Sequence, residues 1–238
     1  MGLTAEKVSE QNNISREDQD KFAVESQQKA TKAQKAGCFI EEIVPVDIPA
    51  TRKKEWFVFS VDECVRPDAS IEKMAKLKPV FKKDGTVTAG NACGIVDGAA
   101  ALIVTTSDFA AKHDLKPLVR VVGHALVGVP PEIMGIGPVP AIPLALRNAG
   151  LTMDDIDLFE INEAFAVQYL ACERELGLDR DKVNVNGGAI ALGHPFGATG
   201  ARLLLSMAIE LHESNKRYGC VSLCIGGGMG IAMIVEKI

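Results

Sequence analysis

Three residues in the second half of the chain have the types and positions that catalysis at a carbonyl group needs. Asn162 lies between a predicted strand and a predicted helix, His194 lies in a glycine-rich loop, and Cys224 directly precedes a glycine-rich turn. Loops that follow strands converge on the ligand crevice of open α/β sheets. A thiol near an imidazole ionises readily and transfers protons near neutral pH, and an asparagine amide can polarise a carbonyl directly or through water. The three residues therefore predict a site for nucleophilic or acid–base catalysis, with a simple helix cap as the alternative for Asn162.

The elements that would position these residues alternate between strands and helices over residues 118–238. Hydrophobic patterns and turn residues predict strands at 118–122, 157–161, 183–185, 218–224 and 229–236. Helices are predicted at 138–150, 163–176 and 201–211. This alternation, which closes with a hairpin, indicates a mixed α/β domain.

The first half of the chain has a less regular pattern. A capping signal that begins at Ser15 predicts a helix ending at Gly37. Two further segments, 39–48 and 56–61, are predicted to be strands. The apolar run at 98–105 predicts a strand that is buried on both faces. We expect this half to form an inserted or appended lobe.

Composition excludes several classes of protein. The chain has 238 residues, a formal net charge of −5 at pH 7 and 47% hydrophobic residues, which are globular proportions. The net negative charge and an aromatic content of 5% argue against nucleic-acid binding. Residues 52–83 run against the overall charge, with nine basic and five acidic side chains. This segment could attract a phosphorylated small molecule, or it could be an ordinary solvated surface.

The cysteines and apolar runs give expectations about environment. The six cysteines show no CxxC pair or other metal-ligand spacing, so we expect reduced thiols and no metal site. No apolar run reaches the length of about 20 residues that a membrane helix needs, and the first residues lack the apolar core of a signal peptide. We therefore expect a soluble intracellular protein that does not bind a membrane.

Three segments together resemble the signature sequences of thiolases, namely INEAFA at 161–166, NVNGGAIALGHPFGATGAR at 184–202 and CIGGGMG at 224–230. Four upstream segments extend the resemblance over nearly the whole chain: MGLTAE, LKPVFKKDGTVTAGNA, DGAAA and MGIGPVPA. The runs NEAFAVQYLACE and GVPPEIMGIGPVPAI are most similar to degradative 3-ketoacyl-CoA thiolases of the mitochondrial type.

The resemblance implies a partial thiolase-like α/β fold. It assigns residues 1–95 to the loop domain that covers coenzyme A, 96–117 to a remnant of the N-terminal domain, and 118–238 to a complete C-terminal βαβαβαββ domain. Thiolases cleave a 3-ketoacyl-CoA with CoA, or condense two acyl-CoA molecules, through an acyl-cysteine. The resemblance thus implies an acetyl-CoA C-acyltransferase that uses CoA as substrate and needs no other cofactor.

The matching motifs also imply roles for individual residues. His194 would be the base that activates the nucleophilic cysteine, and with a water held by Asn162 it would form one oxyanion hole. Cys224 would exchange the proton at the α-carbon of the substrate, and the Gly226 N–H would help to form a second oxyanion hole. The glycine turn and His194 should hold Cys224 closer to the thiolate than the other thiols. Met134 and Phe165 would line the acyl pocket, and the positions that contact CoA would be Arg66, Phe81, Ala89, Ala92 and Cys93.

Two departures from the family pattern bear on activity. The family usually has serine at Cys93, and its nucleophilic cysteine lies in a first-half segment that none of the six cysteines matches. We therefore expect a truncated product or partial gene model that is inactive alone. The alternatives are a non-catalytic CoA-binding or assembly partner of intact thiolase and, ranked last, a Cys-His thioesterase built on Cys224.

The resemblance gives two further expectations. It implies a homo-oligomer, either dimer or tetramer, or pairing with an intact thiolase subunit. It also implies a mitochondrial location, by subfamily alone, with the cytoplasm as the other possibility.

Overall fold

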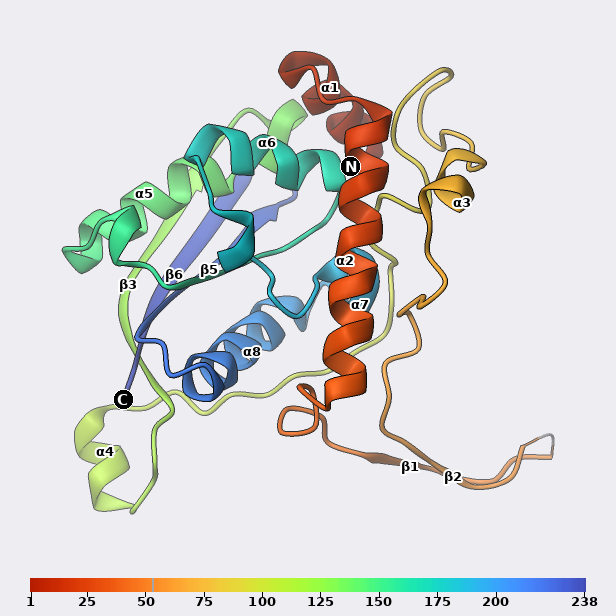
Figure 1. Ribbon diagram of the computed structural model, residues 1–238. Coiled ribbons are helices and arrows are strands. Elements are labelled where there is room, and N and C mark those ends of the chain that lie inside the picture. The colour runs from red at the N-terminus through yellow and green to blue at the C-terminus, as the bar shows by residue number, and fades with distance from the viewer. Residues whose placement is uncertain (53) are drawn as a thin grey trace.

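The computed structural model describes residues 1–52 and 54–238, and a mixed sheet of four strands forms its centre (Figure 1). The strand order is β3-β6-β5-β4, with the bounds Val119–Gly128, Met229–Lys237, Tyr218–Ile225 and Leu158–Ile161. Strand β6 is antiparallel to β3 and to β5, whereas β4 is parallel to β5. Every residue of β4 is buried, as expected for a strand covered on both faces. The predicted α/β class is confirmed; Lys53, one of the nine basic residues of segment 52–83, lies outside the described residues.

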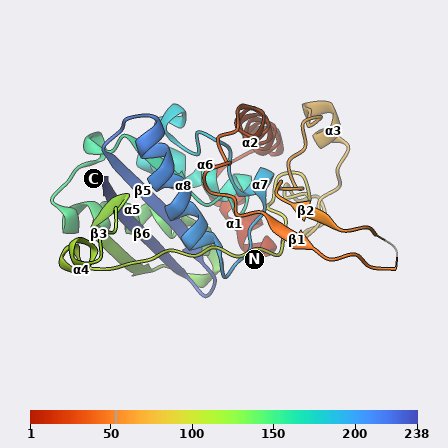
Figure 2. The ribbon, with the colours of Figure 1, turned by 90° about the horizontal axis from the view of Figure 1, so that it is seen from below.

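Helices cover both faces of this sheet. On one face α5 (Pro138–Ala149) packs on β3 and β6, with α6 (Ala166–Leu176) beside it. On the other face α8 (Thr199–Glu213) packs on β4 and β5, and Figure 2 shows it lying across the sheet. The apolar core under α8 consists of Leu158, Leu203, Met207, Leu211, Val221 and Val235. The three predicted helices are confirmed, although α6 begins at Ala166 rather than at residue 163.

Two helices precede the sheet in the chain. Helix α2 (Arg16–Ala36) begins with the predicted capping box, in which the Ser15 hydroxyl accepts a hydrogen bond from the Asp18 N–H and the Asp18 carboxylate accepts one from the Ser15 N–H. It ends at Gly37, whose φ of 80° is in the left-handed region. Helix α1 (Gly2–Asn12) was not predicted. Because α1 packs on α6, and α2 packs on α6 and α7, both helices support the loops that follow the sheet.

The remaining elements are short. A hairpin of β1 (Val46–Ile48) and β2 (Phe57–Phe59) projects from the body in both views. The short helices are α3 (Ile71–Ala75), α4 (Ser107–Lys112) and α7 (Ala189–Leu192), with 3-10 turns at Pro131–Ile136, Met153–Asp155 and Arg180–Lys182. Within residues 1–52 and 54–238, no helix is long and apolar enough to cross a membrane.

Two strand predictions in the first half need correction. Residues 39–42 form turns, and the Ile43 N–H donates to the Phe39 carbonyl at 3.1 Å, so only 46–48 of the predicted strand pairs. Residues 98–105 form neither helix nor strand, and Ile103 and Val104 are 84% and 79% exposed. A buried strand needs neighbours that accept and donate its backbone hydrogen bonds, and no described strand pairs with this segment.

The predicted strand 183–185 is reduced to a single bridge. Val183 pairs with Phe159 of β4, and the Asn184 N–H donates to the Phe159 carbonyl at 2.9 Å. The side chain of Asn184 then takes the place of a neighbouring strand: its Oδ1 accepts from the Ile161 N–H, and its Nδ2 donates to the Ile161 carbonyl, both at 2.9 Å. Asn184 has a φ of 45°, which ends the extended conformation there.

Gly187 permits the close contact between α2 and the loop that follows Asn184. It has a φ of +83°, and a Cβ at this position would lie 2.7 Å from the Ala30 backbone nitrogen. Gly150, which caps α5, has a similar φ of +70° but nothing within 4 Å of a Cβ, so Gly150→Ala is a matched control. We expect Gly150→Ala to cost about 1–2 kcal/mol in free energy of unfolding and Gly187→Ala about 2–5 kcal/mol, measured by urea denaturation. Equal losses would contradict the close packing of α2.

Candidate active site

Asn162 is a buried amide without a hydrogen-bond partner among the described residues. It directly follows β4, and its backbone N–H donates to the Ser222 carbonyl on β5 at 3.0 Å. Its side chain is 1% exposed, and neither Oδ1 nor Nδ2 makes a hydrogen bond. An unpaired buried amide costs about 1–3 kcal/mol, so such a group calls for a bound water or ligand that completes its bonding. The alternative of a helix cap is wrong, because Phe165 is the N-cap of α6.

The neighbouring carboxyl of Glu163 fixes the loop that carries Asn162. Glu163 is 1% exposed and accepts hydrogen bonds from the Ser26 hydroxyl at 2.7 Å, the Asn184 side-chain amide at 2.9 Å and the Ile190 N–H at 3.2 Å. Burial raises the pKa of this carboxyl, and the three donors oppose that effect. The sequence analysis missed this residue. The available signal was an ionisable residue within the otherwise apolar run INEAFA.

The backbone of residues 92–94 joins the two loops that carry Asn162 and His194. The Cys93 N–H donates to the Ala164 carbonyl at 3.1 Å, and Ala92 forms an antiparallel bridge with Phe165. The His194 N–H donates to the Gly94 carbonyl at 2.9 Å. A segment from the first half of the chain therefore holds these two loops of the second half together.

His194 is held at one ring nitrogen. Its Nδ1 lies 2.6 Å from the Thr199 hydroxyl, and the Phe196 ring packs edge-on with the centroids 4.8 Å apart. Burial lowers the pKa of His194, and the positive charge of Arg202 lowers it further. The imidazole is thus favoured in its neutral form, which is the form that a general base needs.

Cys224 is a buried thiol near the end of β5, opposite Gly230 on β6. It is 8% exposed, and burial raises the pKa of its thiol to about 12. The expectation that its surroundings favour the thiolate is therefore wrong for this structure, because loss of solvation outweighs the neighbouring dipoles. Gly226, in the turn that follows, is exposed.

The structure brings only part of the predicted CoA and acyl positions together. Phe81 packs edge-on against the buried Phe165, with the centroids 6.3 Å apart, and Met134 is 1% exposed. Ala89 is exposed. Arg66 is exposed too, and its backbone N–H donates to the Gln27 side chain of α2 at 2.7 Å.

Two basic residues of segment 52–83 form ion pairs with acidic side chains of the same region or of α1. Lys73 pairs with Asp68, and Lys82 pairs with Glu10. Only the pair with Glu10 offsets charge beyond the five acidic residues already counted in the segment, because Asp68 is one of those five.

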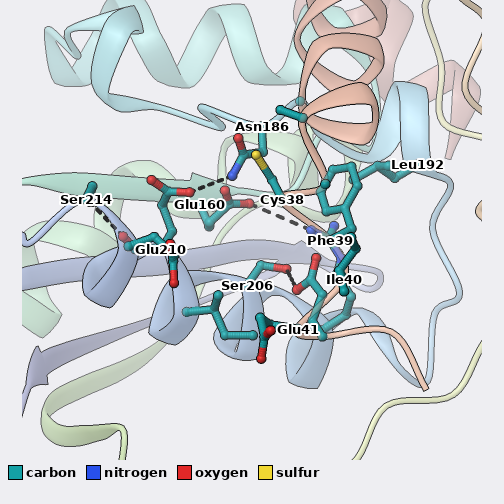
Figure 3. A pocket seen from close by; sticks show the side chains of 17 residues that line it. Cys38, Phe39, Ile40, Glu41, Glu160, Asn186, Leu192, Ser206, Glu210 and Ser214 are labelled. Atoms are coloured by element: carbon teal, nitrogen blue, oxygen red, sulfur yellow. Dashed lines mark hydrogen bonds and ion pairs between the residues drawn. The ribbon is translucent and has the colours of Figure 1, made fainter.

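A cavity of about 490 Å³ lies elsewhere, between the turn after α2 and α8 (Figure 3). Neither Asn162, His194 nor Cys224 lines it. Carboxylates on its walls include Glu41, Glu42, Glu160, Glu210 and Glu213. No group of three or more His, Cys, Asp or Glu side chains in residues 1–52 and 54–238 is arranged to hold a metal ion.

Glu160 and Arg202 face each other in this cavity. Glu160 Oε2 lies 3.8 Å from Arg202 Nη1, and neither Glu160 Oε2 nor Arg202 Nη2 has a hydrogen-bond partner among the described residues. Burial raises the pKa of Glu160 to about 8, although Arg202 opposes this. Burial also raises the pKa of Glu42, whose carboxylate accepts a hydrogen bond from the Ser206 hydroxyl at 2.5 Å.

The Glu160→Gln variant tests this buried carboxyl. An unperturbed glutamate has a pKa of 4.5, whereas folded Glu160 has a pKa of about 8. As the pH rises through this window, the unfolded wild type releases a proton that the folded state retains, so the wild type loses stability and the glutamine variant does not. We expect the difference in free energy of unfolding between Glu160→Gln and the wild type to shift by roughly 2–4 kcal/mol in favour of the variant from about pH 5 to about pH 8. Urea denaturation at each pH measures this difference.

Glu132→Gln is the control for this experiment. Glu132 is exposed, and a backbone hydrogen bond together with Lys7 lowers its pKa, so its carboxyl is ionised throughout the window. Its removal should leave the pH profile unchanged. Parallel profiles for the wild type and Glu160→Gln would contradict the buried protonated carboxyl.

Burial also predicts the order in which the thiols react. Cys38 is exposed, whereas burial raises the pKa of Cys93 to about 11 and that of Cys224 to about 12. Each unit of pKa lowers the thiolate fraction about tenfold, so burial lowers the thiolate fraction of Cys224 roughly 10³-fold from that of a cysteine with the ordinary pKa of 9.0. We therefore expect iodoacetamide to modify the exposed Cys38 well before Cys224. Peptide mapping after timed alkylation measures this order, and all six cysteines should react alike in urea. Modification of Cys224 as fast as Cys38 in the folded chain would contradict the buried neutral thiol.

Comparison with known proteins identifies the family. The model of the thiolase N-terminal domain matches residues 1–108, and that of the thiolase C-terminal domain matches residues 115–237. A probable acetyl-CoA acyltransferase of Staphylococcus epidermidis is 56% identical over 237 residues, which cover 100% of this chain and 60% of the relative.

Two solved structures are similar over the whole chain. Bacillus anthracis acetyl-CoA acetyltransferase matches with a TM-score of 0.97 and 50% identity, covering 100% of this chain and 60% of that one. Human mitochondrial 3-ketoacyl-CoA thiolase in complex with CoA matches with a TM-score of 0.95 and 51% identity, covering 100% and 59%. The chain thus spans about 60% of the length of these relatives, and the expected thiolase-like fold is confirmed. With two thiolase domain models matching nearly all of its residues, the chain belongs to the thiolase family.

Proposed function

We propose that this chain supplies the oxyanion-binding and proton-transfer part of an acetyl-CoA C-acyltransferase. The reaction is thiolytic cleavage of a 3-ketoacyl-CoA or condensation of acyl-CoA molecules. The observation that carries the proposal is the buried, unpartnered amide of Asn162 on a loop that residues 92–94 tie to the loop of His194. Family membership makes the chain an acyltransferase by relationship.

The roles of the residues follow from where charge develops in this reaction. A water bound to Asn162 would donate a hydrogen bond to a thioester oxygen as it becomes negative, and His194 would donate a second one once its Nε2 has taken up a proton. The N–H of Gly226, a residue exposed in the turn after β5, would serve the second tetrahedral oxyanion. Cys224 would take the proton from the α-carbon, and its raised pKa makes its thiolate the stronger base once it forms.

Coenzyme A would enter as substrate, and the family's reaction needs no other cofactor. We propose that CoA lies against Phe81, Ala89, Ala92 and Cys93, with Arg66 at the nucleotide end. The edge-on pair of Phe81 and Phe165 supports a link between this surface and the acyl pocket that Phe165 and Met134 would line. The thiol of Cys93 is a weaker hydrogen-bond partner than serine, which would lower the affinity for the pantetheine arm.

We propose domain boundaries at residues 95 and 117. Residues 1–95 would be the loop domain, 96–117 part of the N-terminal domain, and 118–238 the C-terminal domain. Residues 98–105 are mostly exposed and form neither helix nor strand, which supports assigning the middle segment to a different domain from its two neighbours.

The isolated chain should not form an acyl-cysteine. Cys172, Cys220 and Cys224 are buried, and burial raises the pKa of each thiol. Cys224 also cannot remove the α-proton once it is acylated. A non-catalytic assembly partner is the second candidate, and the exposed apolar residues Ile95, Ile103 and Val104 favour it. A thioesterase that uses Cys224 would need a separate base to activate this thiol, and the matching motifs supply none.

The assembly and location of the protein stay predictions. Pairing as a homo-oligomer or with an intact thiolase subunit would cover the exposed apolar segment around Ile103. A mitochondrial location is supported by the similarity to human mitochondrial 3-ketoacyl-CoA thiolase. The similarity to a relative from Staphylococcus epidermidis equally supports a cytoplasmic location.

Incubation with acetyl-CoA in deuterated water tests the proposed division of labour. If Cys224 and the oxyanion groups act on the substrate, the acetyl methyl group should gain deuterium faster than in buffer. No stoichiometric acyl adduct and no CoA release should accompany the exchange, because no acyl-carrying cysteine is present. Mass spectrometry of substrate and protein, with a thiol assay, measures all three quantities.

The controls separate the possible outcomes. Cys224→Ala should abolish the exchange, and Cys38→Ala, which removes an exposed thiol, should leave it unchanged. Absence of exchange in the folded wild type would contradict the proton-transfer role. A stoichiometric adduct with CoA release, lost in His194→Ala, would show that another cysteine acts as the nucleophile.

A further inference from the structure

The hydroxyl of Thr199 bridges the ring of His194 and a backbone carbonyl. Thr199 is the first residue of α8 and is 0% exposed. Its Oγ1 lies 2.6 Å from His194 Nδ1 and 2.9 Å from the Pro195 carbonyl oxygen. This contact joins a histidine in a glycine-rich loop to the start of a helix that packs on the central sheet.

The two neutral forms of the histidine differ in the number of hydrogen bonds that this bridge can make. A hydroxyl has one proton to donate, and a carbonyl oxygen can only accept. If Nδ1 carries the ring proton, Nδ1–H donates to Thr199 Oγ1, and the hydroxyl donates onward to the Pro195 carbonyl, so two hydrogen bonds form. If Nε2 carries it, the hydroxyl must turn to Nδ1, the bond to Pro195 is lost, and one hydrogen bond remains.

The surroundings of the bridge favour the same form. The Thr199 hydroxyl bonds back to the carbonyl four residues earlier, a local pattern that threonine side chains adopt. Thr199 is fully buried, so no solvent replaces a lost bond at its Oγ1. Burial and the charge of Arg202 both lower the pKa of His194, which favours the neutral ring.

We propose that Thr199 is a positioning residue that fixes His194 in the Nδ1–H tautomer and leaves the Nε2 lone pair free. This inference deepens the proposed function, because a histidine that takes a proton from a thiol needs an unprotonated nitrogen on the side of the substrate. Free histidine favours the Nε2–H form, so the protein has to select the other one. Thr199 makes that selection without touching the substrate.

Nitrogen NMR of the whole chain tests the proposal without substrate. The chain has four histidines, and a His194→Gln spectrum identifies the signals of His194 by their loss. In ¹⁵N-labelled wild type at neutral pH, we expect His194 Nδ1 to resonate as a protonated nitrogen and Nε2 as an unprotonated one. The reverse pattern in the wild type would overturn the proposal, and this measurement needs no variant to fold.

Two variants at position 199 separate the hydroxyl from the shape of the side chain. Thr199→Val keeps the volume but removes the hydroxyl, so the two nitrogen shifts should move toward each other or exchange positions. Thr199→Ser keeps the hydroxyl and should restore the wild-type pattern. Unchanged His194 shifts in a folded Thr199→Val would also overturn the proposal.

The deuterium-exchange experiment and the NMR experiment test different proposals, so either result can be negative without the other. A wild-type Nδ1–H tautomer with no exchange would leave the role of Thr199 intact and contradict the proton-transfer role of Cys224. Exchange together with an Nε2–H tautomer would support the proton-transfer role of Cys224 and contradict the role of Thr199.

Discussion

The buried carboxyl of Glu163 is the interaction on which the candidate site depends. A carboxyl removed from water is costly unless hydrogen bonds replace its solvation. Here the replacements come from Ser26 in α2, from Asn184 beside β4 and from Ile190 in α7, which precedes His194. Satisfying one group therefore fixes three segments of the chain relative to the end of β4. The positions of Asn162 and His194 follow from that constraint, because both lie next to bonded segments.

Burial also decides the protonation of the groups near the site. It favours a neutral imidazole at His194 and a neutral thiol at Cys224, and in the separate cavity beside α8 it raises the pKa of Glu160 to about 8. The common cause is the loss of water around the charged form. The imidazole and the thiol are therefore favoured in their neutral forms, and charge develops on them during the reaction. Fixed dipoles stabilise such developing charge most strongly where water is excluded.

Two apolar segments remain outside this core. The β1–β2 hairpin projects from the body, with Trp56 and Val58 more than a third exposed, and residues 98–105 run across the surface without a pairing strand. Unpaired extended backbone with apolar side chains is prone to add to another strand or surface. The folded core and the candidate site thus coexist with surface that favours association.

The sequence by itself determined the elements whose signals are local. The capping box at Ser15, the glycine at Gly37 and the hairpin of β5 and β6 were predictable because each depends on residues close together in the chain. The motifs around Asn162, His194 and Cys224 were also visible as polar residues at strand ends. Tertiary structure alone decided that 98–105 and 183–185 do not pair as predicted, since pairing requires a neighbour that the local pattern does not specify. It also decided the partners of Glu163, one of which is 137 residues away, and the neutral state of Cys224. Protonation and long-range hydrogen bonding depend on which groups exclude water from one another, and that is a property of the folded chain rather than of any segment.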